Sequence, residues 1–310
     1  MRRQAYTEFL RALGITLAPA QDVGFRVTFN GEEPSALVGA DADLSRMLFD
    51  DVQGDVPTLA RDVVVIVKGA RIGGSRFSAL RALHLALTID LSTLAPGEEA
   101  FVLFVAPDMR LARQTMRYAL GAVQADRALA VMLDGEPSRD GFAIRRGRRR
   151  IQFVCLPATR GGSAVRARSI VCAVLSEAAF FRDADYAVND AEIFRAIAPR
   201  VLPGGQTILE STPWLESGLL FELHRDNFGA PLTALAMHAP TLLMRPDART
   251  RAIVEAERKR SPENAEREFD ALFVGGDASE VAFGIAEKRL EALGMRFDDG
   301  TASRPVKRSA

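Results

Sequence analysis

This sequence of 310 residues has only two cysteines, a net charge of zero and few long apolar runs. Only Cys155 and Cys172 are present, and both lie within apolar runs. This pattern predicts two buried thiols in a reduced intracellular protein and argues against a disulfide or zinc framework. No uninterrupted apolar run is long enough to span a bilayer, and no signal-peptide pattern is found. We therefore expect a cytoplasmic protein with no membrane partner.

The charges balance, with 40 Lys and Arg residues against 40 Asp and Glu residues. A chain of zero net charge does not coat nucleic acid through bulk charge, so any DNA contact must come from local patches. One candidate patch is the predicted hairpin Phe142 to Cys155, in which five arginines crowd a turn at Gly147. These arginines either contact the phosphates of DNA or form a solvated hairpin with acidic partners, and the sequence leaves both interpretations open.

The stretch Val63 to Leu80 organises the rest of the chain. Five β-branched residues from Val63 to Val67 predict a short strand that is buried on both faces. Lys68 to Ser75 is a glycine-bearing turn, and apolar residues recur at helical spacing from Arg76 onward. A strand, a glycine loop and a helix in this order direct backbone N–H groups and a helix N-terminus at a phosphate.

The loop departs from the usual phosphate-loop pattern GxxxxGK[ST]. If Gly73 is the last loop glycine, Gly74 occupies the lysine position and Ser75 the position of the magnesium-binding hydroxyl. Lys68 then stands at the first glycine position, so the single lysine opens the loop. The alternative is a tight turn whose glycines only relieve steric strain.

Further apolar segments at 98–106, 169–175 and 206–210 read as buried strands, the last of them preceded by a turn at Pro203 to Gly205. Helical patterns at 109–120 and 190–197 separate them. Alternation of strands and helices predicts right-handed crossovers in a parallel sheet.

The strand at 169–175 ends in Ser176 and Glu177, followed by Ala-Ala-Phe-Phe. In phosphate-loop ATPases, this position carries an aspartate that holds magnesium and a glutamate that orients the attacking water. Glu177 matches the glutamate, whereas Ser176 replaces the aspartate. A neutral hydroxyl binds magnesium weakly or through water. Either the metal is held mainly by Ser75 and the nucleotide phosphates, with Ser176 as a weak ligand, or hydrolysis is impaired.

Three segments, Lys68 to Ser75, Leu175 to Phe181 and Ser211 to Pro213, occur in the order of the core motifs of tailed-phage terminase large subunits, and the chain resembles this family of DNA-packaging ATPases. The resemblance is greatest to the lambda-type branch, in which a lysine also opens the loop. It covers roughly residues 17–273. It implies an α/β fold, namely a three-layer P-loop NTPase core of the ASCE or RecA-like type with a mainly parallel central sheet and a small C-terminal lid or linker region.

The expected division is a P-loop ATPase core at 1–245, a helical lid or linker at 246–295 and a disordered tail at 296–310. Large terminases continue into an RNase H-like nuclease domain. The residues after Phe273 are too few to form one, so we expect an ATPase domain without the nuclease domain.

The resemblance also implies roles for individual residues, with ATP and Mg²⁺ as cofactors. Glu177 orients water, and Arg71 stands where terminases keep a loop arginine that acts in cis like an arginine finger. Gln21 is expected to contact adenine, although a polar residue in a turn after a proline is the alternative. Ser211 and Thr212 report the state of the γ-phosphate. The residues expected to bind nucleotide are Gln21, Lys68, Ile72, Gly73, Gly74, Ser75, Arg76, Ser211 and Thr212.

The function that the resemblance implies is ATP hydrolysis that drives double-stranded DNA into a viral procapsid in the cytoplasm of a bacterial host cell. The implied partners are the terminase small subunit, the portal protein and further copies of the chain in a ring on the portal. The alternative is a nucleotide- or DNA-binding assembly protein, or a prophage remnant, that kept the fold and lost turnover. Ser176 favours this alternative, whereas Glu177 and Ser75 argue against it.

Overall fold

The computed structural model describes residues 4–158, 165–166, 168–181 and 190–273, together with the backbone of 296–298 and 301–303. The strands of the main sheet are β1 (Val63–Lys68), β2 (Ala100–Ala106), β3 (Gly141–Arg146), β4 (Arg149–Pro157), β5 (Ser169–Ser176), β6 (Val201–Ser211) and β7 (Leu235–Ala239). The helices that contribute most to the layers and the site are α1 (Tyr6–Ala12), α2 (Pro19–Phe25), α3 (Ala40–Phe49), α4 (Thr58–Asp62), α5 (Gly74–Thr88), α6 (Met109–Ala125), α8 (Asp190–Ile197) and α9 (Leu219–Asn227). Three further helices follow near the C-terminal end, namely α10 (Thr241–Met244), α11 (Ala248–Arg260) and α12 (Pro262–Glu268).

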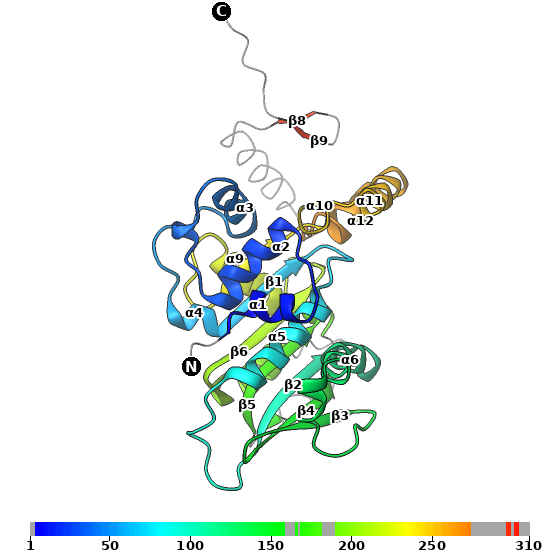
Figure 1. Cartoon of the computed structure of the whole chain (residues 1–310). Coiled ribbons are helices and arrows are strands. Elements are labelled where there is room, and N and C mark those ends of the chain that lie inside the picture. Colours follow the sequence, from blue (N-terminus) through cyan, green and yellow to red (C-terminus); the bar gives the residue numbers. More distant parts are fainter. Residues whose placement is uncertain are drawn as a thin grey trace, which may run out of the picture.

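Within the described residues, the strands form one sheet in the order β3-β4-β2-β5-β6-β1-β7 (Figure 1). All neighbouring strands run parallel except β3 and β4, which form an antiparallel hairpin at one edge. Helices lie on both faces, so the predicted three-layer α/β architecture with a mainly parallel sheet is confirmed. β6 lies between β1 and β5.

Side chains along each central strand alternate between two apolar cores. Val64 and Ile66 of β1 belong to the core beneath α1, α2, α3, α5 and α6, whereas Val65 and Val67 belong to the core beneath α8 and α9. All four side chains are buried. A strand covered on both faces needs apolar residues at every position, which explains the unbroken β-branched run in the sequence.

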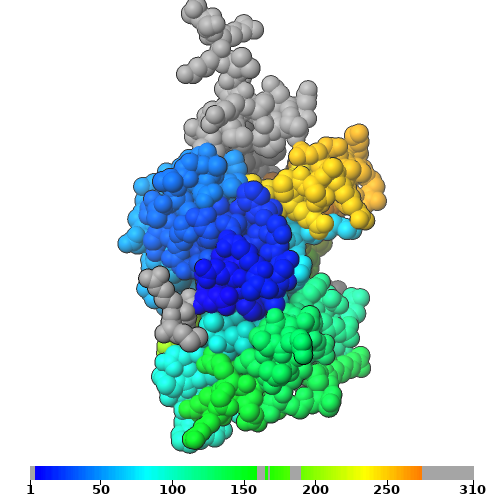
Figure 2. All heavy atoms as spheres, in the orientation of Figure 1, coloured from blue at the N-terminus to red at the C-terminus, as the bar shows by residue number. Residues whose placement is uncertain are grey.

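The N-terminal residues pack on the α5 side of the sheet, where they form the blue surface in Figure 2. Tyr6 is fully buried there, and its hydroxyl donates a hydrogen bond to the carbonyl of Phe77 at 2.6 Å. Its ring also makes edge contacts with Phe25 and Phe29, the latter in a π-helical turn at Arg26–Asn30. These contacts anchor the N-terminal segment to the helix that follows the phosphate loop.

The expected turn at Pro203 to Gly205 is wrong, because these residues lie within β6. Gly204 has a φ of 77°, and the register between β5 and β6 shifts near this point. A Cβ on Gly205 would lie 2.5 Å from the carbonyl oxygen of Val171. The glycines therefore form an irregularity that keeps two strands close, where the sequence suggested a chain reversal.

The predicted arginine hairpin is present as β3 and β4, but most of its arginines have partners within the chain. Arg145 and Arg150 both pair with Asp134, at 2.9 and 2.8 Å. Arg146 and Arg149 donate hydrogen bonds to backbone carbonyls at the end of α5 and in the loop that follows. These contacts favour the solvated hairpin over the DNA-contacting one.

The expected helical lid corresponds in part to α11 and α12, which enclose a small core of Val254, Ala265 and Phe269. Residues 274–295 of the predicted lid lie outside the described residues. At the start of the predicted tail, β8 (Arg296–Asp298) and β9 (Thr301–Ser303) pair as a short antiparallel ribbon. The division into core, lid and tail stays a prediction. Of the helices that the structure describes, none has the length and apolar character to cross a membrane.

We predict that Cys155 and Cys172 react slowly with thiol reagents in the folded protein. Burial raises the pKa of each thiol to about 12, so at pH 8 only about one thiol in 10⁴ is ionised. Titration with Ellman's reagent should label both cysteines rapidly in guanidinium chloride and neither within the same time in buffer. Rapid native labelling of either thiol would contradict the packing described above.

Candidate nucleotide-binding site

The predicted motif residues converge at the carboxyl ends of three neighbouring strands. β1 ends at Lys68, β5 at Ser176 and β6 at Ser211, and β6 lies between the other two. Open parallel sheets bind ligands at this edge. The strand order therefore brings the phosphate loop, the acidic motif and the Ser-Thr-Pro motif to one place.

The loop between β1 and α5 has two residues in the left-handed backbone region. Gly73 has a φ of 86° and immediately precedes α5, where glycine adopts this conformation without cost. Arg71 has a φ of 66°, which is strained for a residue with a side chain. Ser75 follows in the first turn of α5, so the helix N-terminus offers unpaired N–H groups to an anion.

Lys68 lies beneath this loop and is held by two carboxylates. Its side chain is 7% exposed, and its Nζ lies 2.8 Å from Oε1 of Glu177 and 3.2 Å from Oε2 of Glu210. Burial lowers the pKa of Lys68, but the charges of Glu210 and Glu177 outweigh this effect and raise the pKa above its usual range. Lys68 is therefore charged at every physiological pH.

The usual phosphate loop has its lysine at the end of the loop, which corresponds to position 74, whereas here Lys68 stands at the start. Gly74 explains how the side chain of Lys68 can reach the same place. A Cβ on Gly74 would lie 2.5 Å from Cδ and 2.8 Å from Cε of Lys68. The lysine side chain thus passes through the space that a side chain at position 74 would occupy. Glycine is required at this position because the lysine comes from the strand.

Glu177 follows β5 directly and has a left-handed φ of 55°. Its backbone N–H donates to the carbonyl of Glu210 at 2.7 Å, which fixes this unusual turn. Its Oε2 accepts a hydrogen bond from Oγ of Ser211 at 3.1 Å, while its Oε1 contacts Lys68. The side chain is 25% exposed, so the carboxylate faces solvent as well as the lysine.

Glu210 is a site residue that the sequence analysis did not single out. It lies at the end of β6, its side chain is 0% exposed, and its Oε1 accepts a hydrogen bond from Oγ of Ser75 at 2.8 Å. One sequence feature could have identified Glu210: it is a carboxylate at the end of an apolar strand, immediately before Ser-Thr-Pro. A charged residue at such a buried position needs a partner, and Lys68 is that partner.

Ser176 is 2% exposed, and its Oγ lies 3.2 Å from Oγ1 of Thr115 in α6. Its strand partner in β6 is Glu210, the residue that contacts Ser75, so Ser176 and Glu210 lie on the same face of the sheet. The two hydroxyls expected to bind metal thus have different partners, Thr115 for Ser176 and Glu210 for Ser75.

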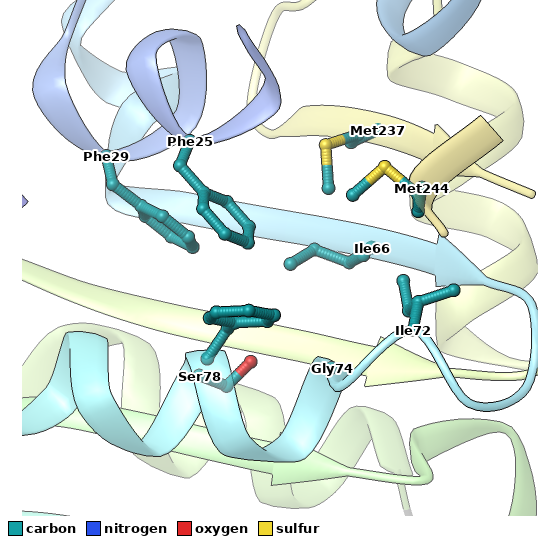
Figure 3. Close-up of a pocket in the computed structure, with 9 residues that line it drawn as sticks. Phe25, Phe29, Ile66, Ile72, Gly74, Ser78, Met237 and Met244 are labelled. Carbon is teal, nitrogen blue, oxygen red and sulfur yellow. The ribbon is translucent and has the colours of Figure 1, made fainter. Parts of the chain in front are cut away.

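The base of the loop is packed with apolar side chains around a void of about 10 Å³, whose aromatic, isoleucine and methionine lining is drawn in Figure 3. Ile72 points from the loop into this layer, toward Ile66 and Met244. Gln21 supports the loop from α2, since its Nε2 donates to the carbonyl of Ile72 at 3.4 Å and its Oε1 accepts from the N–H of Ala18 at 3.0 Å. Gln21 is buried and adjacent to the loop, and its expected contact with adenine stays a prediction.

The end of α12 is attached to the beginning of the loop. The N–H of Ala70 donates to the carbonyl of Glu268 at 2.5 Å, and Thr241 donates to the carbonyls of both Phe269 and Ala70. A Cβ on Gly69 would lie 2.2 Å from Oγ1 of Thr241. The segment Glu268 to Phe269 thus contacts the phosphate loop at Ala70 and also Thr241, which itself contacts the loop.

A hollow of about 220 Å³ lies over the loop. Its lining residues are Lys68, Gly69, Arg71, Ile72, Gly73, Gly74, Ser75, Arg76, Tyr118 and Glu177. Tyr118 of α6 is the member that the sequence analysis missed. Thr212 is buried, and its carbonyl accepts a hydrogen bond from Ser211, the residue that contacts Glu177.

The described part of the chain contains no cluster of three or more histidine, cysteine, aspartate or glutamate side chains that could bind a metal ion by itself. Magnesium in nucleotide sites uses one or two carboxylates together with phosphate oxygens. The oxygens of Ser75 and Glu210 are hard donors at the edge of the loop, and they fit this requirement.

Comparison with solved structures identifies the fold. The ATPase domain of the large terminase of Thermus phage P74-26 matches with a TM-score of 0.50 and 18% identity over 69% of this chain and 89% of that domain. The large terminase of bacteriophage HK97 matches with a TM-score of 0.50 and 18% identity over 68% of this chain and 47% of its own length. No family model and no curated protein matches the sequence. The chain has the fold of phage large-terminase ATPase domains, as its motifs predict.

We predict that Lys68→Met lowers the free energy of unfolding by about 3–5 kcal/mol, because it leaves Glu210 charged and buried. The double variant Lys68→Met, Glu210→Met should recover most of this loss, since an apolar pair replaces the ion pair. Guanidinium unfolding of both variants measures the effect. Equal stability of Lys68→Met and the wild type would show that Lys68 and Glu210 do not form the buried pair.

Proposed function

We propose that this chain is a terminase-type motor domain that hydrolyses ATP to move double-stranded DNA into a procapsid. One observation carries the proposal: Lys68 and Ser75 of the phosphate loop meet Glu177 of the acidic motif at a single hollow at the sheet edge. The fold of phage large-terminase ATPase domains supports the same reading.

The residues divide the work of phosphoryl transfer, which needs positioning and charge neutralisation more than covalent help. The loop N–H groups from Ile72 to Ser75 hold the phosphates, and the ammonium of Lys68 neutralises their charge. The carboxylate of Glu177 accepts a hydrogen bond from the attacking water and orients it toward the γ-phosphorus. Arg71 is exposed at the rim of the hollow, where a guanidinium can stabilise the charge that develops on the phosphate.

Magnesium, when bound with ATP, would neutralise part of the charge of the phosphates. Ser75 would hold it through its hydroxyl. Ser176 has a hydroxyl partner in α6, so its weak metal contact would require a rotation away from Thr115.

Coupling to DNA movement is assigned to the hydrogen bond between Ser211 and Glu177. When Glu177 turns toward water and nucleotide, Ser211 loses this partner, and the end of β6 registers the change. The DNA, the terminase small subunit, the portal protein and the neighbouring copies in a ring are the partners that such a motor needs.

We expect ATP turnover that linear duplex DNA stimulates. Glu177→Gln should lower kcat by about 10²- to 10⁴-fold, because the amide is a poor acceptor for the proton of the attacking water, while nucleotide affinity changes little. Steady-state phosphate release measures this effect. Glu222→Gln, a substitution at an exposed position on α9, is the matched control and should behave as the wild type.

The catalytically impaired assembly protein makes the opposite prediction. In that case the wild type binds nucleotide without turnover, and Ser176→Asp restores hydrolysis. This outcome would replace the motor with a binding protein of the same fold.

A further inference from the structure

The acidic motif lacks the carboxylate that usually holds magnesium. Ser176 stands in its place, and the hydroxyl of Ser176 lies against Thr115 of α6. A working site for magnesium and ATP, as proposed above, therefore needs a negative oxygen from elsewhere, because a neutral hydroxyl supplies too little charge for a hard cation.

Glu210 lies where such an oxygen is needed. In the sheet it pairs with Ser176 of β5 on one side and with Ile66 of β1 on the other. It is thus one strand closer to the phosphate loop than the usual aspartate. Glutamate and aspartate differ by one methylene, so a glutamate on β6 reaches the first turn of α5 directly.

The contacts of Glu210 support this role. Its Oε1 accepts the hydrogen bond from Oγ of Ser75, the hydroxyl assigned to magnesium. Its Oε2 forms an ion pair with Lys68 at 3.2 Å but accepts no hydrogen bond among the described residues, although it is buried. This oxygen lies beside the start of α5, where a Cβ on Gly74 would be 2.8 Å away. Beyond its ion pair with Lys68, it has acceptor capacity left for a cation or for the water bound to one.

We propose that Glu210 is the carboxylate that holds the magnesium ion of the nucleotide, together with Ser75, in place of the missing acid at position 176. This inference rests on the proposed ATPase function. It explains why the chain keeps a buried glutamate at the end of β6 and why a serine is tolerated at the end of β5.

Binding of Mn²⁺ tests the assignment without turnover. Electron paramagnetic resonance measures free Mn²⁺ in the presence of the protein and ATPγS, and a fluorescent ATP analogue measures nucleotide binding with Mn²⁺ or with EDTA. Glu210→Gln should weaken Mn²⁺ binding by about 10- to 100-fold and leave nucleotide binding in EDTA close to that of the wild type. The double variant Glu210→Gln, Ser176→Asp should regain part of the Mn²⁺ affinity.

Two further variants keep the test decisive. Glu210→Asp retains the charge beside Lys68, so it should fold even if Glu210→Gln does not, and its shorter side chain should still weaken Mn²⁺ binding. Glu177→Gln removes the other carboxylate on Lys68 and should weaken Mn²⁺ binding much less. Equal losses in Glu177→Gln and Glu210→Gln would reduce the effect to general charge and overturn the assignment.

The outcomes separate this inference from the proposed function. If the wild type binds the nucleotide analogue neither with Mn²⁺ nor in EDTA, the proposed ATPase function fails. If the wild type binds Mn²⁺ and nucleotide together and both Glu210 variants keep full Mn²⁺ affinity, only the role of Glu210 is wrong.

Discussion

The buried ion pair between Lys68 and two glutamates is the interaction on which the site depends. An ammonium in this position needs countercharge, and Glu177 and Glu210 supply it from the ends of β5 and β6. Ser75 donates a hydrogen bond to Glu210, and Ser211 donates one to Glu177. One network therefore joins three strand ends and the start of α5. The two glutamates differ in exposure, at 25% for Glu177 and 0% for Glu210. In the proposed cycle, phosphate competes for Lys68 and releases the exposed Glu177 to orient water, while Glu210 stays in place.

The surrounding fold holds this network from two sides. The apolar layer of aromatic and methionine side chains supports the loop from below, and Tyr6 attaches the N-terminal helices to the same helix α5. On the other side, the end of α12 is hydrogen-bonded to Ala70 at the start of the loop. A movement of the loop on nucleotide binding therefore reaches α11 and α12 through backbone contacts. This connection offers the proposed motor a direct route from the nucleotide to its C-terminal helices.

Much of the fold follows from local sequence patterns. Apolar β-branched runs and helical periodicity identify the central strands and crossover helices, because strands covered on both faces need continuous apolar residues. The convergence of Lys68, Ser75, Glu177 and Ser211 is also predictable, since carboxyl ends of parallel strands meet at one edge. Glu210 is not, because its partners depend on β6 lying between β1 and β5, and chain order does not state the order of strands in the sheet.

Two other features could not be predicted from the sequence, because they too depend on residues that are distant along the chain. Pro203 to Gly205 has the composition of a turn, but a glycine irregularity within a strand uses the same residues. The arginines of the β3–β4 hairpin suggest a nucleic-acid contact, yet Asp134 and backbone carbonyls distant in the sequence satisfy most of them. Both misreadings concern residues whose role is decided by partners far along the chain, which local patterns do not reveal.

A crystal structure of the chain with magnesium and ATPγS tests the central claim most directly. The account predicts phosphates over the loop N–H groups from Ile72 to Ser75, the ammonium of Lys68 on a phosphate oxygen, and Glu177 released from Lys68. Nucleotide bound elsewhere, or a loop that excludes nucleotide at saturating concentration with Lys68 still paired to Glu177, would contradict it.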